Sequence, residues 1–263
     1  MITVKWIPGA IASAMLWAAM CAVAADDPTR EELKRDAINR VIEAHDVSLP
    51  VYIGRVYVKQ AALKEARDLL AARGKAAGLG VKSWNMDVPQ WQAAERELMA
   101  GIDDLIRRKV ASGYWVQEAW SQEVAGVLNG EEADEVAVHF RTEGGELQRR
   151  VIEWFVGELT LQTYTFTDRL KYGVPGSENE MRDLQIVTSE AKSHFAPIYD
   201  LTKYEGTMRF ANSEAGIKYF RMMAMQGVGI LHAHLESVAT EARQMIRSHA
   251  ALVDPYVENA RPR

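Results

Sequence analysis

Two stretches carry the same order of residue types: Phe140-Arg141-Thr142-Glu143-Gly144-Gly145 and, further along, Phe210-Ala211-Asn212-Ser213-Glu214-Ala215-Gly216. In each, a hydroxyl residue precedes a glutamate, a small residue and a glycine, and an amphipathic run follows. A Ser or Thr at the N-cap accepts a hydrogen bond from a free backbone N–H, and glutamate in the first turn suits the helix dipole. Both stretches are therefore predicted to begin helices, with Thr142 and Ser213 as caps.

The glycine of each stretch, Gly145 or Gly216, falls at the third helical position. Glycine in a helix costs about 1 kcal/mol relative to alanine, so a compensating contact is expected there. We expect the preceding helix to cross closely over the first turn, with Phe140 and Phe210 packed against the new helix. The shared pattern favours an internal repeat that arose by duplication. The alternative is that two ordinary helix caps look alike by chance.

Helical periodicity extends over almost all of the chain after Pro28 and predicts an all-α, multi-helix bundle of about eight or nine helices. The segment Gly173-Val174-Pro175-Gly176 is the strongest interruption, because glycine and then proline end helices. It divides the chain into two halves that we expect to be related. The expected organisation is a leader (1–24), an N-terminal helical half (25–173), a C-terminal helical half (177–254) and a frayed tail (255–263).

Two segments depart from a simple helical pattern. Residues 51–58 are rich in β-branched and aromatic side chains, which suit an edge strand, but the helical pattern continues beyond them without a breaker. We favour a helix there. The run Asp87-Val88-Pro89-Gln90 predicts another helix start, with Asp87 as the cap and Pro89 in the first turn. That helix is expected to continue to about Val110.

The first 24 residues have the features of a secretory signal peptide. Lys5 precedes an apolar run over residues 6–23, and Ala22-Val23-Ala24 fits the small-x-small cleavage rule. An uncleaved membrane anchor is the rival interpretation, although the run is short for a span. We expect a periplasmic or secreted protein that is not in the membrane after cleavage. The single cysteine, Cys21, would leave with the leader, so no disulfide is expected.

The charge balance disfavours two classes of partner. Loss of Lys5 with the leader changes the formal net charge from −5 to −6. Nucleic-acid binding usually requires a basic field, and binding to a membrane surface by charge requires a polybasic segment. The densest basic runs are Arg107-Arg108-Lys109 and Arg149-Arg150, and both are expected on solvated helix faces.

No pattern in the sequence predicts catalytic, cofactor-binding or metal-binding residues. The chain lacks the Gly-x-Ser-x-Gly nucleophile motif and a glycine-rich phosphate loop that ends in Lys-Ser/Thr. His232 and His234 are two residues apart, so on a helix they point in different directions. A helical cell-wall hydrolase that uses a single buried glutamate is the remaining enzymatic alternative.

Aromatic residues offer a candidate surface for a partner. Trp115 and Trp120 are five positions apart and cannot both lie centrally on one helical stripe, and Tyr114 lies beside them. Core packing is the default interpretation of such residues. The sharper hypothesis is a surface formed by Tyr114, Trp115 and Trp120, because Trp and Tyr are enriched in the binding hot spots of protein interfaces.

The pattern Phe-x-Thr-x-x-Gly at Phe140 and Phe-x-x-Ser-x-x-Gly at Phe210, each after a short helix, resembles a family of exported bacterial helical domains. That family is catalogued as a domain of unknown function, and its members usually carry a signal peptide and an aromatic-x-Ser/Thr-x-x-Gly turn. The family often has proline after the hydroxyl residue, where this chain has Glu143 and Glu214. Some similar proteins are periplasmic immunity proteins that neutralise antibacterial effectors, and no catalytic residues carry over from the family.

We therefore expect an exported, non-enzymatic protein that binds another protein in the periplasm, with inhibition of a delivered effector as its specific form. The alternatives are binding of a small molecule or cell-wall fragment between the halves, and the helical hydrolase. A deep apolar pocket would favour binding of a small ligand. An exposed aromatic or acidic face would favour a protein partner. A buried, unpaired glutamate in a cleft would favour the enzyme. The two repeated turns themselves are expected to be buried and structural.

Overall fold

The computed structural model describes residues 29–172, 189–196 and 204–261, and these residues are all-α without a strand. The predicted all-α class is therefore confirmed for the described residues. The predicted leader and the interruption at residues 173–176 lie outside the described residues. None of the described helices is long and apolar enough to cross a membrane.

Helices of very different lengths follow one another along the chain. They are α2 (Arg30–Ala44), α3 (Ser48–Ala76), α4 (Pro89–Leu98), α5 (Ile102–Lys109), α6 (Tyr114–Val127), α7 (Gly130–His139), α8 (Glu143–Tyr172), α10 (Glu205–Ala211), α11 (Glu214–Met222), α12 (Val228–Ser248) and α13 (Asp254–Asn259). Residues 189–195 are also helical. A π-helical turn, η2 (Met223–Gly227), joins α11 to α12, and a 3-10 turn, η3 (Ala250–Val253), joins α12 to α13.

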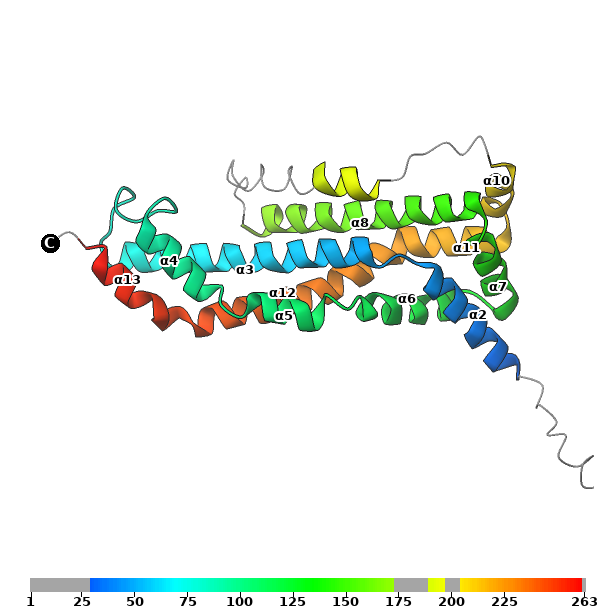
Figure 1. Ribbon diagram of the computed structural model, residues 1–263, viewed down its shortest axis with the longest axis horizontal. Helices are drawn as coiled ribbons and strands as arrows, with labels where there is room; N and C mark the ends of the chain where they lie inside the picture. Colours follow the sequence, from blue (N-terminus) through cyan, green and yellow to red (C-terminus); the bar gives the residue numbers. More distant parts are fainter. Residues whose placement is uncertain (1–28, 173–188, 197–203, 262–263) are drawn as a thin grey trace, which may run out of the picture.

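These helices form an elongated bundle (Figure 1). The three long helices α3, α8 and α12 run along its length and pack against one another. Helices α4 and α13 lie together at one end, whereas α7, α10 and α11 lie at the opposite end. Helix α2 packs against α6 and α7. The two repeated turns, which precede α8 and α11, therefore lie at the same end of the molecule.

One hydrophobic core runs through the bundle. It includes Val58 and Leu70 of α3, Val156 of α8, and Leu235 and Ile246 of α12, all of them fully buried. Burial of one such side chain stabilises the fold by about 1.5–3 kcal/mol. The same core thus contains residues from both sides of the boundary predicted at residues 173–176.

Residues 51–58 belong to α3, so the helical interpretation of this segment is confirmed. Ile53 and Tyr57 are buried, whereas Arg55 and Lys59 are exposed. This spacing of four residues places one helical face in the core and another in solvent. The segment is a helix because its packing against α8 and α12 overrides the strand preference of its β-branched side chains.

The single helix predicted over residues 87–110 is wrong in two respects. It begins at Pro89 with Val88 as the N-cap and has no side-chain capping bond. Asp87 instead lies in the preceding turn, where its backbone N–H donates to Asn85 Oδ1 at 2.8 Å. The helix is also interrupted after α4, where Gly101 has a φ of 85°. A positive φ cannot continue a right-handed helix, so α5 starts in a new direction.

The C-terminal run is helical for longer than predicted and less regular. Residues 213–251 contain the π-helical turn Met223–Gly227, and a Cβ on Gly227 would lie 3.2 Å from Val156 Cγ1 of α8. The missing side chain at Gly227 therefore lets α8 approach this turn closely. Part of the predicted frayed tail, residues 255–259, instead lies in α13, where Val257 is buried and the helix packs against α4.

Candidate functional site: a groove between two helix turns

The two repeated turns have the same local geometry. Thr142 Oγ1 accepts a hydrogen bond from the backbone N–H of Gly145 at 3.0 Å. Helix α8 begins at Glu143, directly after Thr142. Ser213 Oγ accepts the equivalent bond from the backbone N–H of Gly216 at 3.2 Å. Helix α11 begins at Glu214, directly after Ser213. Each hydroxyl therefore satisfies a backbone donor that the first helical turn would leave free.

The glycines are required by a carbonyl group of the preceding helix. A Cβ on Gly145 would lie 1.9 Å from the backbone oxygen of His139, and a Cβ on Gly216 would lie 2.0 Å from that of Phe210. The same two oxygens accept hydrogen bonds from the N–H groups of the capping residues, both at 2.9 Å. His139 and Phe210 are therefore the equivalent positions, and the pairing of Phe140 with Phe210 expected from the sequence is shifted by one residue.

The two turns meet in space through these equivalent residues. The His139 ring stacks on Phe210 with the ring centroids 3.8 Å apart and an interplanar angle of 15°. Gln148 of α8 accepts a hydrogen bond from His139 Nε2 at 2.7 Å and donates one to the carbonyl of Thr207 at 3.1 Å. Gly144 lies so close to α10 that a Cβ would be 2.6 Å from the Thr207 methyl carbon. Helices α7, α8 and α10 are thus tied together at the turns.

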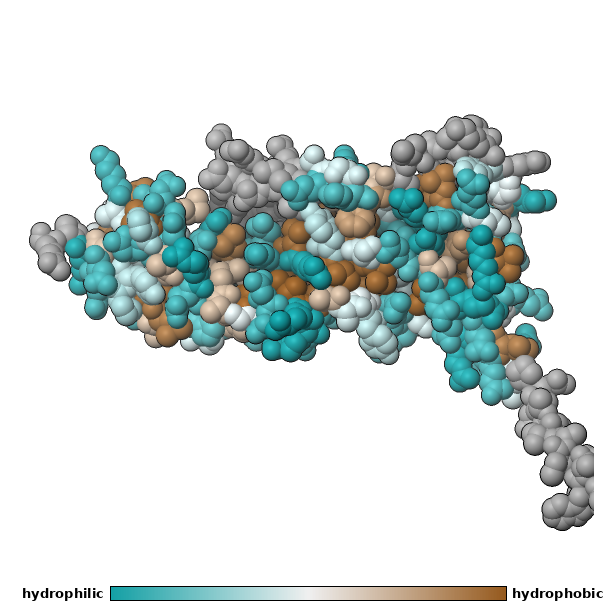
Figure 2. Space-filling model, viewed as in Figure 1, coloured by the Kyte–Doolittle hydropathy of each residue, from teal (hydrophilic) through white to brown (hydrophobic). Residues whose placement is uncertain are grey.

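An open groove of about 500 Å³ lies between the turns. Hydrophobic residues reach the surface at this end of the molecule among hydrophilic ones (Figure 2). The groove is lined by Glu135, Val138, His139, Thr142, Glu143, Gly144, Tyr204, Gly206, Thr207, Arg209, Phe210 and Ser213. The repeated turns are therefore only partly buried: Gly145 and Gly216 are buried, whereas Thr142 and Ser213 line the groove.

Charged and aromatic groups share the groove wall. The Tyr204 hydroxyl donates to Glu143 Oε1 at 2.9 Å and links the start of α8 to the start of α10. Glu135 and Arg209 are exposed. Burial lowers the pKa of His139 below its ordinary value, although the hydrogen bond with Gln148 and the charge of Glu135 oppose this shift. The His139 imidazole is thus neutral at pH 7, with Nε2 as the donor.

Acidification should destabilise the folded protein through His139. Because the folded pKa of His139 is lowered, the unfolded chain binds the proton first, and this contribution to stability is lost as the pH falls below the ordinary value of 6.5. We expect the His139 imidazole to titrate at a lower pH in the folded protein than in urea, as measured by NMR. A folded-state midpoint at or above the value in urea would contradict this assignment.

Tyr114, Trp115 and Trp120 do not form one exposed surface. Tyr114 is 66% exposed, but Trp115 stacks on His234 and Trp120 is almost fully buried beside His45. Helix α6 contacts α2, α11 and α12, so two different stripes of this helix can be buried. Neither tryptophan is available to a partner, and the default interpretation of core packing applies to both.

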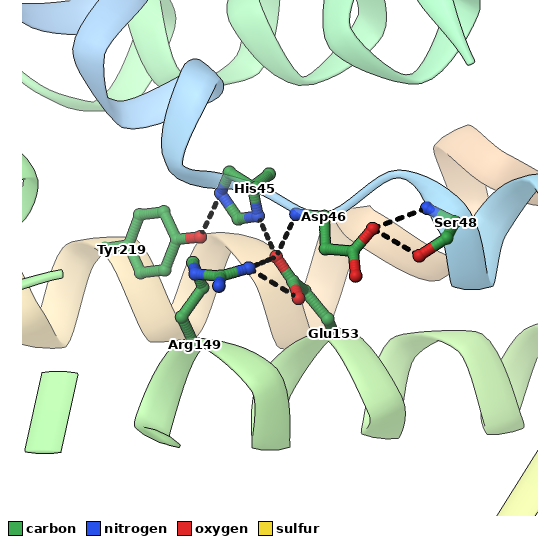
Figure 3. Close-up of polar contacts among 6 residues, drawn as sticks. All are labelled: His45, Asp46, Ser48, Arg149, Glu153 and Tyr219. Atoms are coloured by element: carbon green, nitrogen blue, oxygen red, sulfur yellow. Dashed lines mark hydrogen bonds and ion pairs between the residues drawn. The ribbon is translucent and has the colours of Figure 1, made fainter. Parts of the chain in front are cut away.

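A buried polar cluster was not predicted from the sequence. His45, in the α2–α3 connection, places Nδ1 2.6 Å from Glu153 Oε1 and Nε2 2.6 Å from the Tyr219 hydroxyl (Figure 3). Arg149 donates to both oxygens of Glu153 at 2.8 and 2.9 Å. The expectation that Arg149 lies on a solvated face is therefore wrong, because its helix face turns inward toward this cluster. The spacing of four between Arg149 and Glu153 was the available signal.

The geometry of this cluster lets both ring nitrogens of His45 form hydrogen bonds. A ring that donates from Nδ1 to Glu153 and accepts at Nε2 from the Tyr219 hydroxyl would satisfy all three groups. Burial raises the pKa of Tyr219 well above its ordinary value, and the charge of Glu153 adds to this while that of Arg149 opposes it. Glu153 is buried but paired with Arg149, and it does not line the groove. Glu153 is therefore not a buried, unpaired glutamate in a cleft, which is the feature expected of a catalytic glutamate.

A second set of similar residue types lies between α3 and α12. The Tyr57 hydroxyl donates to Glu236 Oε2 at 2.8 Å, and Arg243 donates to Glu236 Oε1 at 2.8 Å. The ring of His232 lies edge-on to that of Tyr57. His234 points elsewhere and stacks on a tryptophan. Among the described residues, no group of three or more His, Cys, Asp and Glu side chains is placed to hold a metal ion.

The groove combines exposed positions with side chains of several kinds, whereas the two clusters are built into helix contacts. The groove is therefore the candidate binding site. Its function has to be inferred from its own chemistry, because comparisons of this chain with protein-family models, curated proteins and solved structures found no match.

Proposed function

We propose that this protein is an exported, non-enzymatic binding protein whose groove receives a segment of another protein in the periplasm. The observation that carries this proposal is the open groove of about 500 Å³ with apolar side chains exposed at its edge. Val138, which lines the groove, is 55% exposed. Apolar groups that are exposed around a concave surface and flanked by polar ones are typical of protein interaction sites.

Charge favours a segment that is basic as well as apolar. Glu135 and Glu143 line the groove from α7 and α8, and Arg209 is the cation among the lining residues. Glu131 is a further exposed carboxylate at the start of α7, whereas Glu132 is paired with Lys218. Opposite charge on the partner would steer its approach and select against acidic competitors.

Binding of a small molecule or cell-wall fragment is the alternative. The groove volume falls within the range of roughly 300–1,000 Å³ that is usual for ligand pockets. Such pockets normally enclose most of the ligand, and the open shape of this groove favours a partner that brings its own surface. The hydrolase alternative has less support, because Glu153 is occupied by Arg149 and His45.

Two narrower proposals accompany this function. Inhibition of a delivered antibacterial effector rests on the family resemblance and would make the protein a periplasmic immunity protein. We also infer that the α7–α8 and α10–α11 pairs descend from one duplicated unit that gave two related halves. The matched geometry supports that inference: a Cβ added to Gly145 or to Gly216 would lie equally close to the backbone oxygen of His139 or of Phe210.

Site-specific photocrosslinking tests the proposed function. Replacement of Val138 by p-benzoylphenylalanine should yield a discrete protein adduct in exporting cells, whereas the same replacement at Val81 should not. Val81 is 82% exposed and lies in the α3–α4 connection, far from the groove. Equal adducts from both positions, or none from Val138, would count against a protein partner. A small molecule that co-purifies with the protein and blocks the Val138 adduct would favour the alternative.

The same experiment should respond to charge. Glu135→Lys should reduce the Val138 adduct about tenfold, because juxtaposed like charges cost more than about 1.4 kcal/mol. Glu97→Lys serves as the matched control, since Glu97 is also exposed but lies on α4 at the opposite end. An adduct that is insensitive to Glu135→Lys would contradict a basic partner segment.

A further inference from the structure

The groove walls belong to helices that meet at one buried histidine. Helix α8 follows Thr142 and helix α11 follows Ser213, so the starts of both helices border the groove. Glu153 lies ten residues after the start of α8, about 15 Å along the axis. Tyr219 lies five residues after the start of α11, about 8 Å along its axis.

His45 bridges these two helices from a third segment of the chain. Its side chain is fully buried, and its two nitrogens contact Glu153 of α8 and Tyr219 of α11 at 2.6 Å each. Figure 3 shows the imidazole between the Tyr219 hydroxyl and the Glu153 carboxylate, with Arg149 donating to both oxygens of Glu153. The backbone N–H of Asp46 adds a fourth bond to Glu153 at 3.2 Å.

A chain of aromatic contacts continues from this cluster to the groove. Tyr219 meets Phe140 at a centroid distance of 5.1 Å, and Phe140 meets Phe210 at 6.3 Å. Phe210 in turn stacks on His139, and both of these residues line the groove. Packed side chains with little free volume transmit a displacement of one helix to its neighbours.

We propose that His45 is a positioning residue that fixes the spacing of α8 and α11 and thereby the shape of the groove. This role deepens the proposed function, since it concerns the same groove, but it can be tested without a partner. His45 holds the two helices through both ring nitrogens, because Nδ1 contacts Glu153 and Nε2 contacts the buried Tyr219 hydroxyl. The charged groups that face His45 are Glu153 and Arg149 from α8, with Asp46 adjacent to it in the chain.

A pair of isosteric variants separates this role from general stability. Tyr219→Phe removes only the hydroxyl that bonds His45. Tyr57→Phe removes the hydroxyl of a similarly buried tyrosine, which bonds Glu236 between α3 and α12. Spin labels on Glu146→Cys and Ile217→Cys, both exposed positions near the starts of α8 and α11, report the spacing in a Cys21→Ser background.

We expect Tyr219→Phe to shift the label distance by about 1–2 Å or to broaden its distribution, and Tyr57→Phe to leave it unchanged. An unchanged distance in Tyr219→Phe, or equal changes in both variants, would overturn the proposal. Imidazole NMR of the wild-type chain is the second measurement: Nδ1 of His45 should carry the proton that it shares with Glu153, and a ring with a proton on Nε2 alone would also overturn the proposal. Because no partner is present, failure here leaves the crosslinking test of function intact.

Discussion

Gly145→Ala and Gly216→Ala should each lower the free energy of unfolding by about 3 kcal/mol, the upper part of the range for overpacked sites. The added Cβ would lie 1.9 or 2.0 Å from a backbone carbonyl oxygen, and a backbone oxygen cannot rotate away as a flexible side chain can. Relief requires the preceding helix to move by about 1 Å, which disturbs the cap and the His139–Phe210 stack together. Urea unfolding followed by circular dichroism measures the change.

Gly229→Ala is the control for this prediction. Gly229 is exposed in α12, and a Cβ there would meet no atom within 4 Å. Alanine should therefore stabilise the protein by about 0.5–1 kcal/mol through its higher helix propensity. If Gly145→Ala and Gly229→Ala changed stability in the same direction, the carbonyl contact would not be the reason for the glycine.

Arg149→Met should cost about 3–5 kcal/mol, because it leaves the buried Glu153 carboxylate without its charged partner. Arg40→Met is the matched control. Arg40 also forms an ion pair, with Asp134 at 2.6 Å, but both side chains are more than a third exposed. Exposed pairs contribute about 0–1 kcal/mol, so the control should unfold close to the wild type.

A double variant identifies the cause of this loss. Arg149→Met combined with Glu153→Gln should recover part of the stability, since the neutral amide oxygen can still accept from His45 and from the Asp46 N–H. Differential scanning calorimetry of the wild type, Arg149→Met, Arg40→Met and the double variant compares their stabilities. A double variant that is less stable than Arg149→Met would show that lost packing, and not the unpaired charge, dominates.

Local features of this fold follow from the sequence because their partners are close in the chain. Thr142 and Gly145 are three residues apart, so the hydrogen bond between them depends only on the first turn of α8. The helical period of residues 51–58 likewise indicates which side chains turn inward. By contrast, the interruption at Gly101 was not predicted, since a single glycine within a helical pattern is compatible with either outcome.

The candidate site depends on contacts between distant segments, which one sequence does not specify. The groove exists because His139 and Phe210 stack, and these residues come from different parts of the chain. His45 and Tyr219 are separated by 174 residues, so neither gave a signal of the buried cluster. Trp115 and Trp120 were ambiguous for a related reason: a helix contacted on several sides buries residues that no single stripe would contain.

The stack between His139 and Phe210 makes the groove depend on a contact between distant parts of the chain. A nascent chain that ends after α8 contains one complete turn, its cap and its glycine, but only one side of the groove. The other side is supplied by α10 and the start of α11, so loop closure over a long intervening segment must precede any binding. Without residues 204–213, the apolar edge at Val138 has no opposite wall. The groove is therefore complete only when both repeated turns are folded together.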